Sequence, residues 1–133
     1  MPNKMKSYEY YFQRFLLGVS YTKNIDYGDP KAVRRNNNGV NMYRKAAVAI
    51  AEYYPDRISE FSELIEDDDQ DIRTACAVSI LTLMNASPAH KKAALLVIRN
   101  LVSSGTSLEK TAWTMWLEKW GYKNAEGRST PSP

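Results

Sequence analysis

Apolar residues recur every three or four positions through six successive segments of the chain, and this spacing limits the possible folds more than any other feature. The first segment has Tyr8, Tyr11, Phe12, Phe15, Leu16 and Val19 in this pattern. Such spacing lines up apolar side chains along one face of an α-helix. Outside these segments no four residues alternate between apolar and polar, and no Asn-Gly turn separates two β-branched runs. The sequence therefore predicts an all-α protein.

Capping and turn residues predict where the helices begin and end. The first expected helix covers about residues 5–23, the second runs from Asp29 and Pro30 to Tyr54, and the third runs from Asp56 into an acidic stretch. The fourth begins directly after that stretch, the fifth begins at Ser87 and Pro88, and the sixth runs from Thr106 or Ser107 to Gly121. Residues 36–39, "NNNG", are poor helix formers, and glycine costs a helix about 1 kcal/mol relative to alanine. We expect a weak point there but no break.

Two helices in the C-terminal half carry apolar patterns that predict their place in the fold. The helix after the acidic stretch is apolar on most of its circumference, so we expect it at the centre of the domain. The last helix has an expected inward stripe of Leu108, Ala112, Trp113, Trp116, Leu117 and Trp120. The three tryptophans either seal the end of the core, which is the commoner role, or form an interface. Residues 1–121 are expected to form one domain and the polar residues 122–133 a disordered tail.

The chain also contains an internal repeat. An offset of 37 residues pairs Arg73 with Lys110, Thr74 with Thr111, Ala75 with Ala112 and Ile80 with Leu117. A fainter third copy, "YRKAAVAIAEYY", resembles "IRTACAVSILTL". A repeat of this length that spans two helices is typical of helical solenoids. Six helices therefore predict three stacked helix pairs.

The junction "LIEDDDQDIRTACAVSIL" resembles the turn between the two helices of a HEAT repeat. The resemblance implies a right-handed α-solenoid of about three antiparallel helix pairs, in which Asp67 and Arg73 link adjacent units. The second copy has Ser104 and Lys110 at these places, which departs from the pattern. In length, helix order and junction the chain is also similar to small bacterial HEAT-like proteins, some of which are immunity proteins for secreted toxins.

Charge is strongly segregated along the chain. Residues 52–71 hold nine acids and one base, Arg57, for a local charge of −8, whereas the whole chain carries +3. The acids do not match a calcium-binding loop, because Ile72 and Val78 stand where that loop needs glycine and glutamate. Asp68 or Asp69 is expected to cap the following helix. The candidate partner-binding residues are Glu60, Glu63, Glu66, Asp67, Asp68 and Asp71, although charge runs are often only solvated turns.

These features predict a non-catalytic protein-binding module. Its most concrete form is an immunity protein that binds and occludes a basic toxin domain, such as a nuclease, through the acidic surface. The alternative is a nucleic-acid-binding HEAT-like repeat protein that uses the basic helix residues Lys31, Arg34, Arg35, Arg44 and Lys45. A scaffold that oligomerises through its tryptophans is a weaker third hypothesis.

The sequence offers little for catalysis. His90 is the only histidine and lies in a polar stretch, and Cys76 is the only cysteine and lies on an apolar stripe. Glycine-rich phosphate loops and nucleophile motifs are absent from the sequence. We therefore expect no enzymatic activity, no cofactor and no metal. The lone cysteine and the lack of a long apolar run or signal peptide favour a cytoplasmic protein that does not enter membranes.

Overall fold

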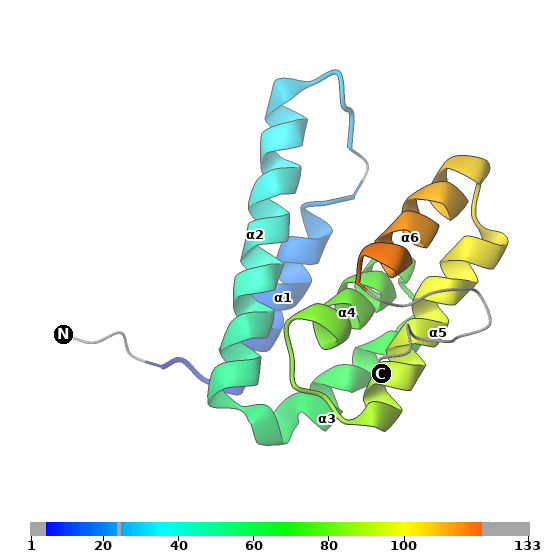
Figure 1. Ribbon diagram of the computed structural model, residues 1–133. Helices are drawn as coiled ribbons and strands as arrows, with labels where there is room; N and C mark the ends of the chain where they lie inside the picture. Colours follow the sequence, from blue (N-terminus) through cyan, green and yellow to red (C-terminus); the bar gives the residue numbers. More distant parts are fainter. Residues whose placement is uncertain (1–4, 24, 121–133) are drawn as a thin grey trace.

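A computed structural model describes residues 5–23 and 25–120 and contains six α-helices in this part of the chain (Figure 1). These elements are α1 (Tyr8–Ser20), α2 (Pro30–Tyr53), the short 3-10 helix η1 (Pro55–Arg57), α3 (Ile58–Phe61), the 3-10 helix η2 (Ser62–Glu66), α4 (Gln70–Thr82), α5 (Pro88–Ser104) and α6 (Ser107–Lys119). No strand occurs within these two ranges. The predicted all-α class is confirmed. None of the described helices is long and apolar enough to cross a membrane.

Side-chain caps start the longer helices where the sequence predicts them. Asp29 accepts a hydrogen bond from the backbone N–H of Lys31 at the start of α2, and Ser87 accepts one from His90 at the start of α5. Thr106 caps α6 in a reciprocal capping box with Glu109. Asp69, and not Asp68, caps α4. Because a cap acts within a few residues of its own position, local sequence was enough to place these helix starts.

The predicted boundaries were wrong in two places. α1 begins after its cap Ser7 and ends at Ser20, so it is shorter than residues 5–23. The segment after α2 is one turn of α-helix, α3, between two 3-10 helices; it begins at Pro55, and Asp56 caps none of its parts. The predicted stop at Gly121 and the tail 122–133 lie outside the described residues.

α2 runs unbroken through residues 36–39 and packs antiparallel to α1 (Figure 1). Gly39 of α2 lies against Gly18 of α1, and the backbones of the two helices are in close contact there. A Cβ atom on Gly39 would lie 2.5 Å from the carbonyl oxygen of Gly18, and one on Gly18 would lie 2.7 Å from that of Gly39. Backbone oxygens cannot move aside as a flexible side chain can. Gly39 is therefore required by the close approach of two helices, which propensity alone does not reveal.

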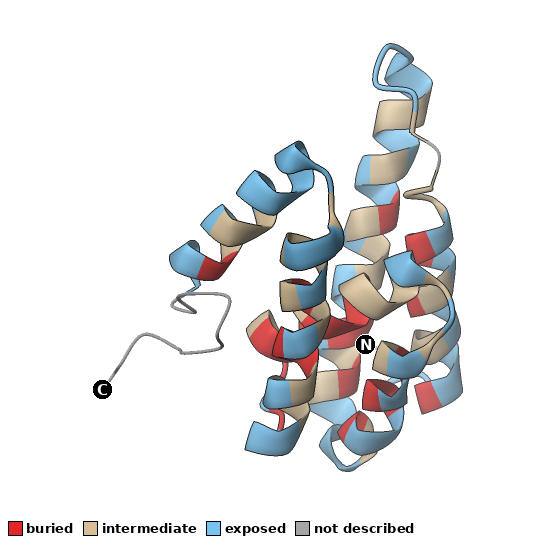
Figure 2. Cartoon of the chain, turned by 90° about the vertical axis from the view of Figure 1, so that its right-hand side faces the viewer, coloured by how far each residue is buried: buried red, intermediate tan, exposed pale blue. Residues whose placement is uncertain are grey.

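The core lies between α1, the C-terminal half of α2, α3, α4 and α5 (Figure 2). Its largest fully buried side chains include Phe15, Phe61, Ile50, Ile80 and Ile98. The ring of Phe15 contacts that of Phe61 edge-to-face, with centroids 4.9 Å apart. α4 buries Ala75, Cys76, Ala77, Ser79, Ile80 and Leu81. The prediction that this helix is central is confirmed.

α6 packs on α5 and is the least buried of the long helices. Leu117 is buried, and Trp113 and Trp116 are partly buried against the core. Their two rings pack edge-to-face on each other, with centroids 5.6 Å apart. The predicted inward positions of Leu108 and Ala112 were wrong, because both are exposed and Leu108 is 80% exposed. Trp120 is 46% exposed. The tryptophan stripe is therefore only partly core.

Consecutive helices are neighbours throughout: α1 packs on α2, α4 on η2 and α5, and α5 on α6. The right-handed stacking of HEAT-like units stays a prediction. Arg73 donates hydrogen bonds to the backbone carbonyls of Asp67, at 2.8 Å, and Asp68, at 3.0 Å. The carboxylate of Asp67 instead accepts the backbone N–H of Asp69 at 2.9 Å. These bonds hold the turn before α4 together.

Candidate binding surfaces

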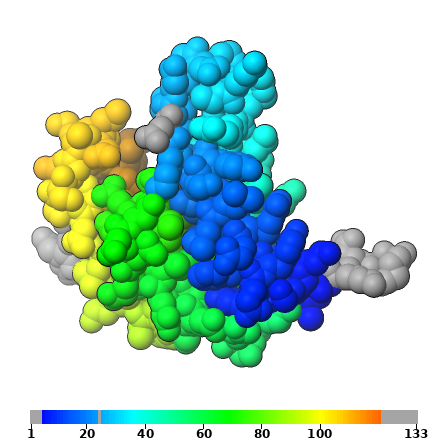
Figure 3. All heavy atoms as spheres, turned by 180° about the vertical axis from the view of Figure 1, so that it is seen from behind, coloured from blue at the N-terminus to red at the C-terminus, as the bar shows by residue number. Residues whose placement is uncertain are grey.

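An acidic hollow opens between α1 and the α3–η2 segment. It measures about 490 Å³ and is lined by Tyr8, Glu9, Phe12, Gln13, Glu60, Glu63 and Leu64. Figure 3 shows α1, in blue, directly against the green segments that include α3 and α4. Three carboxylates thus surround a wall made of two aromatic rings and a leucine. We call this set of residues the acidic hollow.

Arg57 forms ion pairs with two acids of the hollow, Glu9 and Glu60, and so neutralises part of its charge. Its Nε donates to Glu60 Oε1 at 2.8 Å and its Nη2 to Glu9 Oε2 at 3.2 Å. Its guanidinium also lies 4.1 Å from the centroid of the Tyr8 ring. The hydrogen bond from Arg57 holds the pKa of the Glu60 carboxyl below its usual value, so Glu60 stays ionised. Glu63 is exposed and makes no ion pair with any described residue.

Tyr8 forms a buried part of the wall of the acidic hollow. Its side chain is almost fully buried, and its hydroxyl has no hydrogen-bond partner among the described residues. Burial, followed by the nearby charge of Glu60, raises the pKa of Tyr8 to about 12, so the hydroxyl keeps its proton at neutral pH. An unsatisfied buried hydroxyl costs folding free energy of about 1–3 kcal/mol.

Lys23, in the loop after α1, neutralises two acids at the start of α4. Its Nζ lies 2.6 Å from Asp69 Oδ2 and 2.8 Å from Asp71 Oδ2. The hydrogen bond from Lys23 lowers the pKa of Asp69, and the bonds to Asp69 and Asp71 raise the pKa of Lys23. Asp71 is thereby tied to the α1–α2 loop and contributes little free charge to a partner.

The six acids predicted as a site therefore separate into groups. Glu60 and Glu63 line the acidic hollow, Glu66 and Asp68 are exposed at the turn before α4, Asp67 is engaged in that turn, and Asp71 pairs with Lys23. Sequence reasoning missed Glu9, which comes from a distant segment. No local signal could have paired it with Glu60, because Glu9 is a lone acid on a helix with a mostly aromatic face.

The Asp69–Lys23 pair predicts a loss of stability in acid. The folded pKa of Asp69 lies below its ordinary value of 3.8, so the unfolded chain binds more protons around that pH. The stabilisation is present above about pH 4 and is lost as pH falls through the folded pKa. Urea unfolding at pH 7, 4 and 3 should show this fall, and Lys23→Met should reduce it. An equal fall in Lys23→Met and in the control Lys92→Met would contradict the pair.

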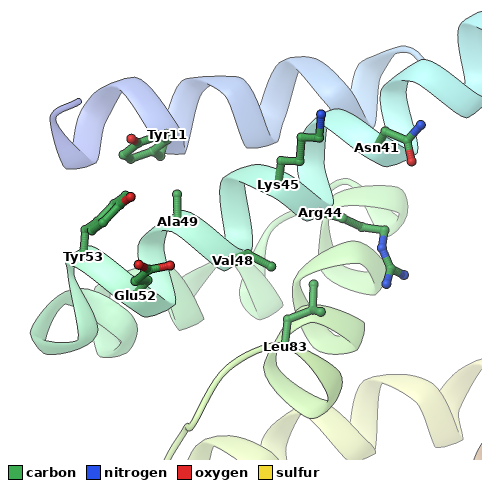
Figure 4. A pocket seen from close by; sticks show the side chains of 9 residues that line it. All are labelled: Tyr11, Asn41, Arg44, Lys45, Val48, Ala49, Glu52, Tyr53 and Leu83. Atoms are coloured by element: carbon green, nitrogen blue, oxygen red, sulfur yellow. The ribbon is translucent and has the colours of Figure 1, made fainter. Parts of the chain in front are cut away.

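A second concave surface lies along the side of α1 and α2 that carries basic residues. Its main hollow, about 680 Å³, is lined by Tyr11, Asn41, Arg44, Lys45, Val48, Ala49, Glu52, Tyr53 and Leu83 (Figure 4). An adjoining hollow of about 200 Å³ is lined by Tyr10, Tyr11, Arg14, Met42, Lys45 and Ala46. The two hollows share Tyr11 and Lys45, and together we call them the tyrosine–basic groove.

Within the groove, aromatic and charged side chains occupy different ends. Tyr11 of α1 and Tyr53 of α2 face each other at one end, with ring centroids 6.2 Å apart (Figure 4). Arg44 and Lys45 come from α2 at the other end, where Lys45 points toward α1 and Arg44 points to the opposite side of α2, near Leu83 (Figure 4). Of the five basic residues predicted as an alternative site, these two line the groove. Lys31, Arg34 and Arg35 lie outside it, exposed on the first two turns of α2.

Cys76 and His90 are the two residues that the sequence analysis considered for catalysis. Cys76 is fully buried, its thiol lies 3.6 Å from the carbonyl oxygen of Phe61, and burial raises the pKa of that thiol. His90 is half-buried, and its Nδ1 lies 2.9 Å from Ser87 Oγ. Across residues 5–23 and 25–120, no three His, Cys, Asp or Glu side chains converge as a metal site would need.

Comparisons with known proteins identified no relative of this chain. No protein-family model, curated protein or solved structure matches the chain. The HEAT-like resemblance therefore stays a prediction from the junction motif and the repeat.

Proposed function

We propose that this protein is a non-catalytic binding module that docks a basic segment of a protein partner at the acidic hollow. The observation that carries the proposal is the juxtaposition of Glu9, Glu60 and Glu63 around an apolar wall. A lysine or arginine side chain of a partner fits this chemistry, because its stem is apolar and its end is charged. The stem would pack on Phe12 and Leu64 while the charged end meets the carboxylates.

The charge around the acidic hollow supports fast association with such a partner. Glu66 and Asp68 are exposed beyond the hollow and are absent from the ion pairs of the described residues. They extend a negative potential from a segment whose sequence charge is −8. Like charges gathered on one face steer an oppositely charged protein before contact and fix its orientation.

The most concrete version of this proposal is an immunity protein. In length, helix order and junction the chain resembles small bacterial HEAT-like proteins, some of which have that role, and a nuclease toxin presents a basic surface to its substrate. Covering that surface would block the toxin without any chemistry. Rescue of bacteria that express a toxin encoded next to this gene would support this version. Equal rescue by wild type and by Glu63→Lys would contradict the use of the acidic hollow.

The hollow itself can be tested without a known partner. The probe is a fluorescein-labelled octaarginine peptide, titrated at low salt and followed by anisotropy and by backbone amide chemical shifts. Glu63→Lys should weaken binding by about tenfold, because it turns an attraction at close range into a repulsion. Glu118→Lys, which makes the same change of charge at an exposed position of α6, should weaken it much less.

Chemical shifts decide whether the peptide occupies the hollow. The proposal expects the largest changes at α1, α3 and η2. Equal weakening by Glu63→Lys and Glu118→Lys, with shifts spread over all exposed acids, would show general attraction to negative charge and would overturn the proposal.

A further inference from the structure

We propose that the tyrosine–basic groove binds single-stranded nucleic acid. This inference does not depend on the acidic hollow. The groove lies on a different side of α1, and none of its lining residues lines the acidic hollow.

Exposed aromatic side chains are the first observation. Tyr10 and Tyr53, which line the two parts of the groove, are 44% and 40% exposed although they are large and apolar. Tyr11 lies between them, with its ring centroid 5.4 Å from that of Tyr10 and 6.2 Å from that of Tyr53. A cluster of tyrosine rings that is open to solvent is a platform on which unpaired bases stack, whatever their sequence.

Positive charge is the second observation. Arg14, Arg44 and Lys45 line the groove, against a single acid, Glu52. Beyond the groove, the exposed Arg34 and Lys31 lie on the same side of α2 as Lys45, whereas Arg35 lies about 80° around the helix from it. At a rise of 1.5 Å per residue, Lys31 lies roughly 21 Å along the helix from Lys45. This length is sufficient for the backbone of several nucleotides.

The shape of the surface favours a single strand over other anionic partners. Bases in a duplex are already stacked in pairs and cannot present a face to Tyr10 or Tyr53. An acidic helical peptide would need apolar pockets spaced along the whole surface. The apolar lining is confined to the groove, at Val48, Ala49 and Leu83, whereas the outward residues of the first turns of α2 are basic or asparagine.

The acidic hollow does not oppose this binding, because α1 lies between the two surfaces. Tyr8, Glu9 and Phe12 of α1 line the hollow, whereas Tyr10 and Arg14 line the groove. In an α-helix these two sets point to opposite sides. Glu60 and Glu63, the acids of the charged segment that line the hollow, therefore lie away from the path of the phosphates, whereas Glu52 of that segment lies in the groove.

The test uses fluorescein-labelled oligo-uridine and oligo-deoxythymidine strands of about 12 nucleotides, with anisotropy measured at about 50 mM salt and above. We expect the double variant Arg44→Ala/Lys45→Ala to weaken binding by at least about tenfold. The variant should lose about one to two phosphate contacts, and the slope of the logarithm of the binding constant against the logarithm of the salt concentration should become less steep by about 0.7 for each. The matched control Lys92→Ala/Lys119→Ala removes the same charge at exposed positions elsewhere and should weaken binding far less.

Tyr53→Leu separates stacking from general attraction to charge. It keeps an apolar side chain in the groove and should weaken single-strand binding several-fold at unchanged salt slope. Tighter binding of either the uridine or the deoxythymidine strand supports the proposal and assigns the groove to RNA or to DNA respectively. Thermal unfolding of each variant shows that it is folded.

Three results would overturn the inference: equal affinity for a duplex of the same length, equal loss in the Arg44/Lys45 variant and its control, or no effect of Tyr53→Leu. The readout is also separate from that of the acidic hollow. Glu63→Lys should not weaken oligonucleotide binding, so failure of one proposal leaves the other standing.

Discussion

Replacing Phe61 with alanine is expected to lower the free energy of unfolding by about 3–5 kcal/mol. Phe61 is fully buried and its ring packs edge-to-face on Phe15. It is carried by α3, a single turn that has few contacts of its own with which to compensate. Because a small domain is stable by only about 5–15 kcal/mol, this substitution should leave a measurable unfolded fraction in water. Urea unfolding followed by circular dichroism measures the change.

Two further variants show whether the loss comes from the cavity. Phe61→Leu keeps much of the volume and should cost much less than Phe61→Ala. Leu108→Ala removes a large side chain that is 80% exposed and should change stability by no more than about 0.5 kcal/mol. A loss in Phe61→Ala no larger than that in Leu108→Ala would contradict the described core.

Replacing Gly39 with alanine is expected to destabilise the protein by about 1–3 kcal/mol, although alanine is the better helix former. Propensity alone predicts a gain of about 1 kcal/mol at an interior helix position. Packing predicts the opposite, because the new Cβ would lie 2.5 Å from the backbone oxygen of Gly18 and 2.6 Å from the Cβ of Tyr21. The helices must then move apart. The sign of the change in the urea midpoint decides between these effects.

Asn38→Ala is the matched control for Gly39→Ala. Asn38 is exposed on the same turn of α2, so only propensity applies there and the variant should gain a few tenths of a kcal/mol. If Gly39→Ala also gains stability, α1 and α2 do not approach as described. Separation of the two helices would also widen the tyrosine–basic groove, which residues of both line. Gly39→Ala should therefore weaken oligonucleotide binding more than Asn38→Ala does.

Sequence reasoning was most successful where the cause of a structure is local. Asp29, Ser87 and Thr106 were recognised as helix starts because their side chains bond to backbone groups within three residues. The central position of α4 followed from an apolar surface that no single neighbour can cover. The same reasoning placed Leu108 inward because of its spacing, but α6 lies at the end of the packed helices, and none of the residues that the structure describes buries Leu108.

The sequence identified only some of the residues that line each candidate surface. A count of charges identified Glu60 and Glu63, and a basic helix identified Arg44 and Lys45. Their partners Glu9 and Arg14 come from α1, far away in the chain. Tyr11 was assigned to the core face of α1, yet it also lines the groove, because at a helix edge one side chain can serve both. Its neighbour Tyr10 carried no periodic signal.

The sequence by itself determined the all-α class, most helix starts and the separation of charge, because these depend on the residue and its near neighbours. Only the tertiary structure decided which acids keep free charge. Lys23 neutralises Asp69 and Asp71, and Arg57 reaches Glu9, over separations of 46 to 48 residues. It also decided that Gly39 is a point of helix contact. Both outcomes depend on distances between segments that only the packing of α1 against its neighbours sets.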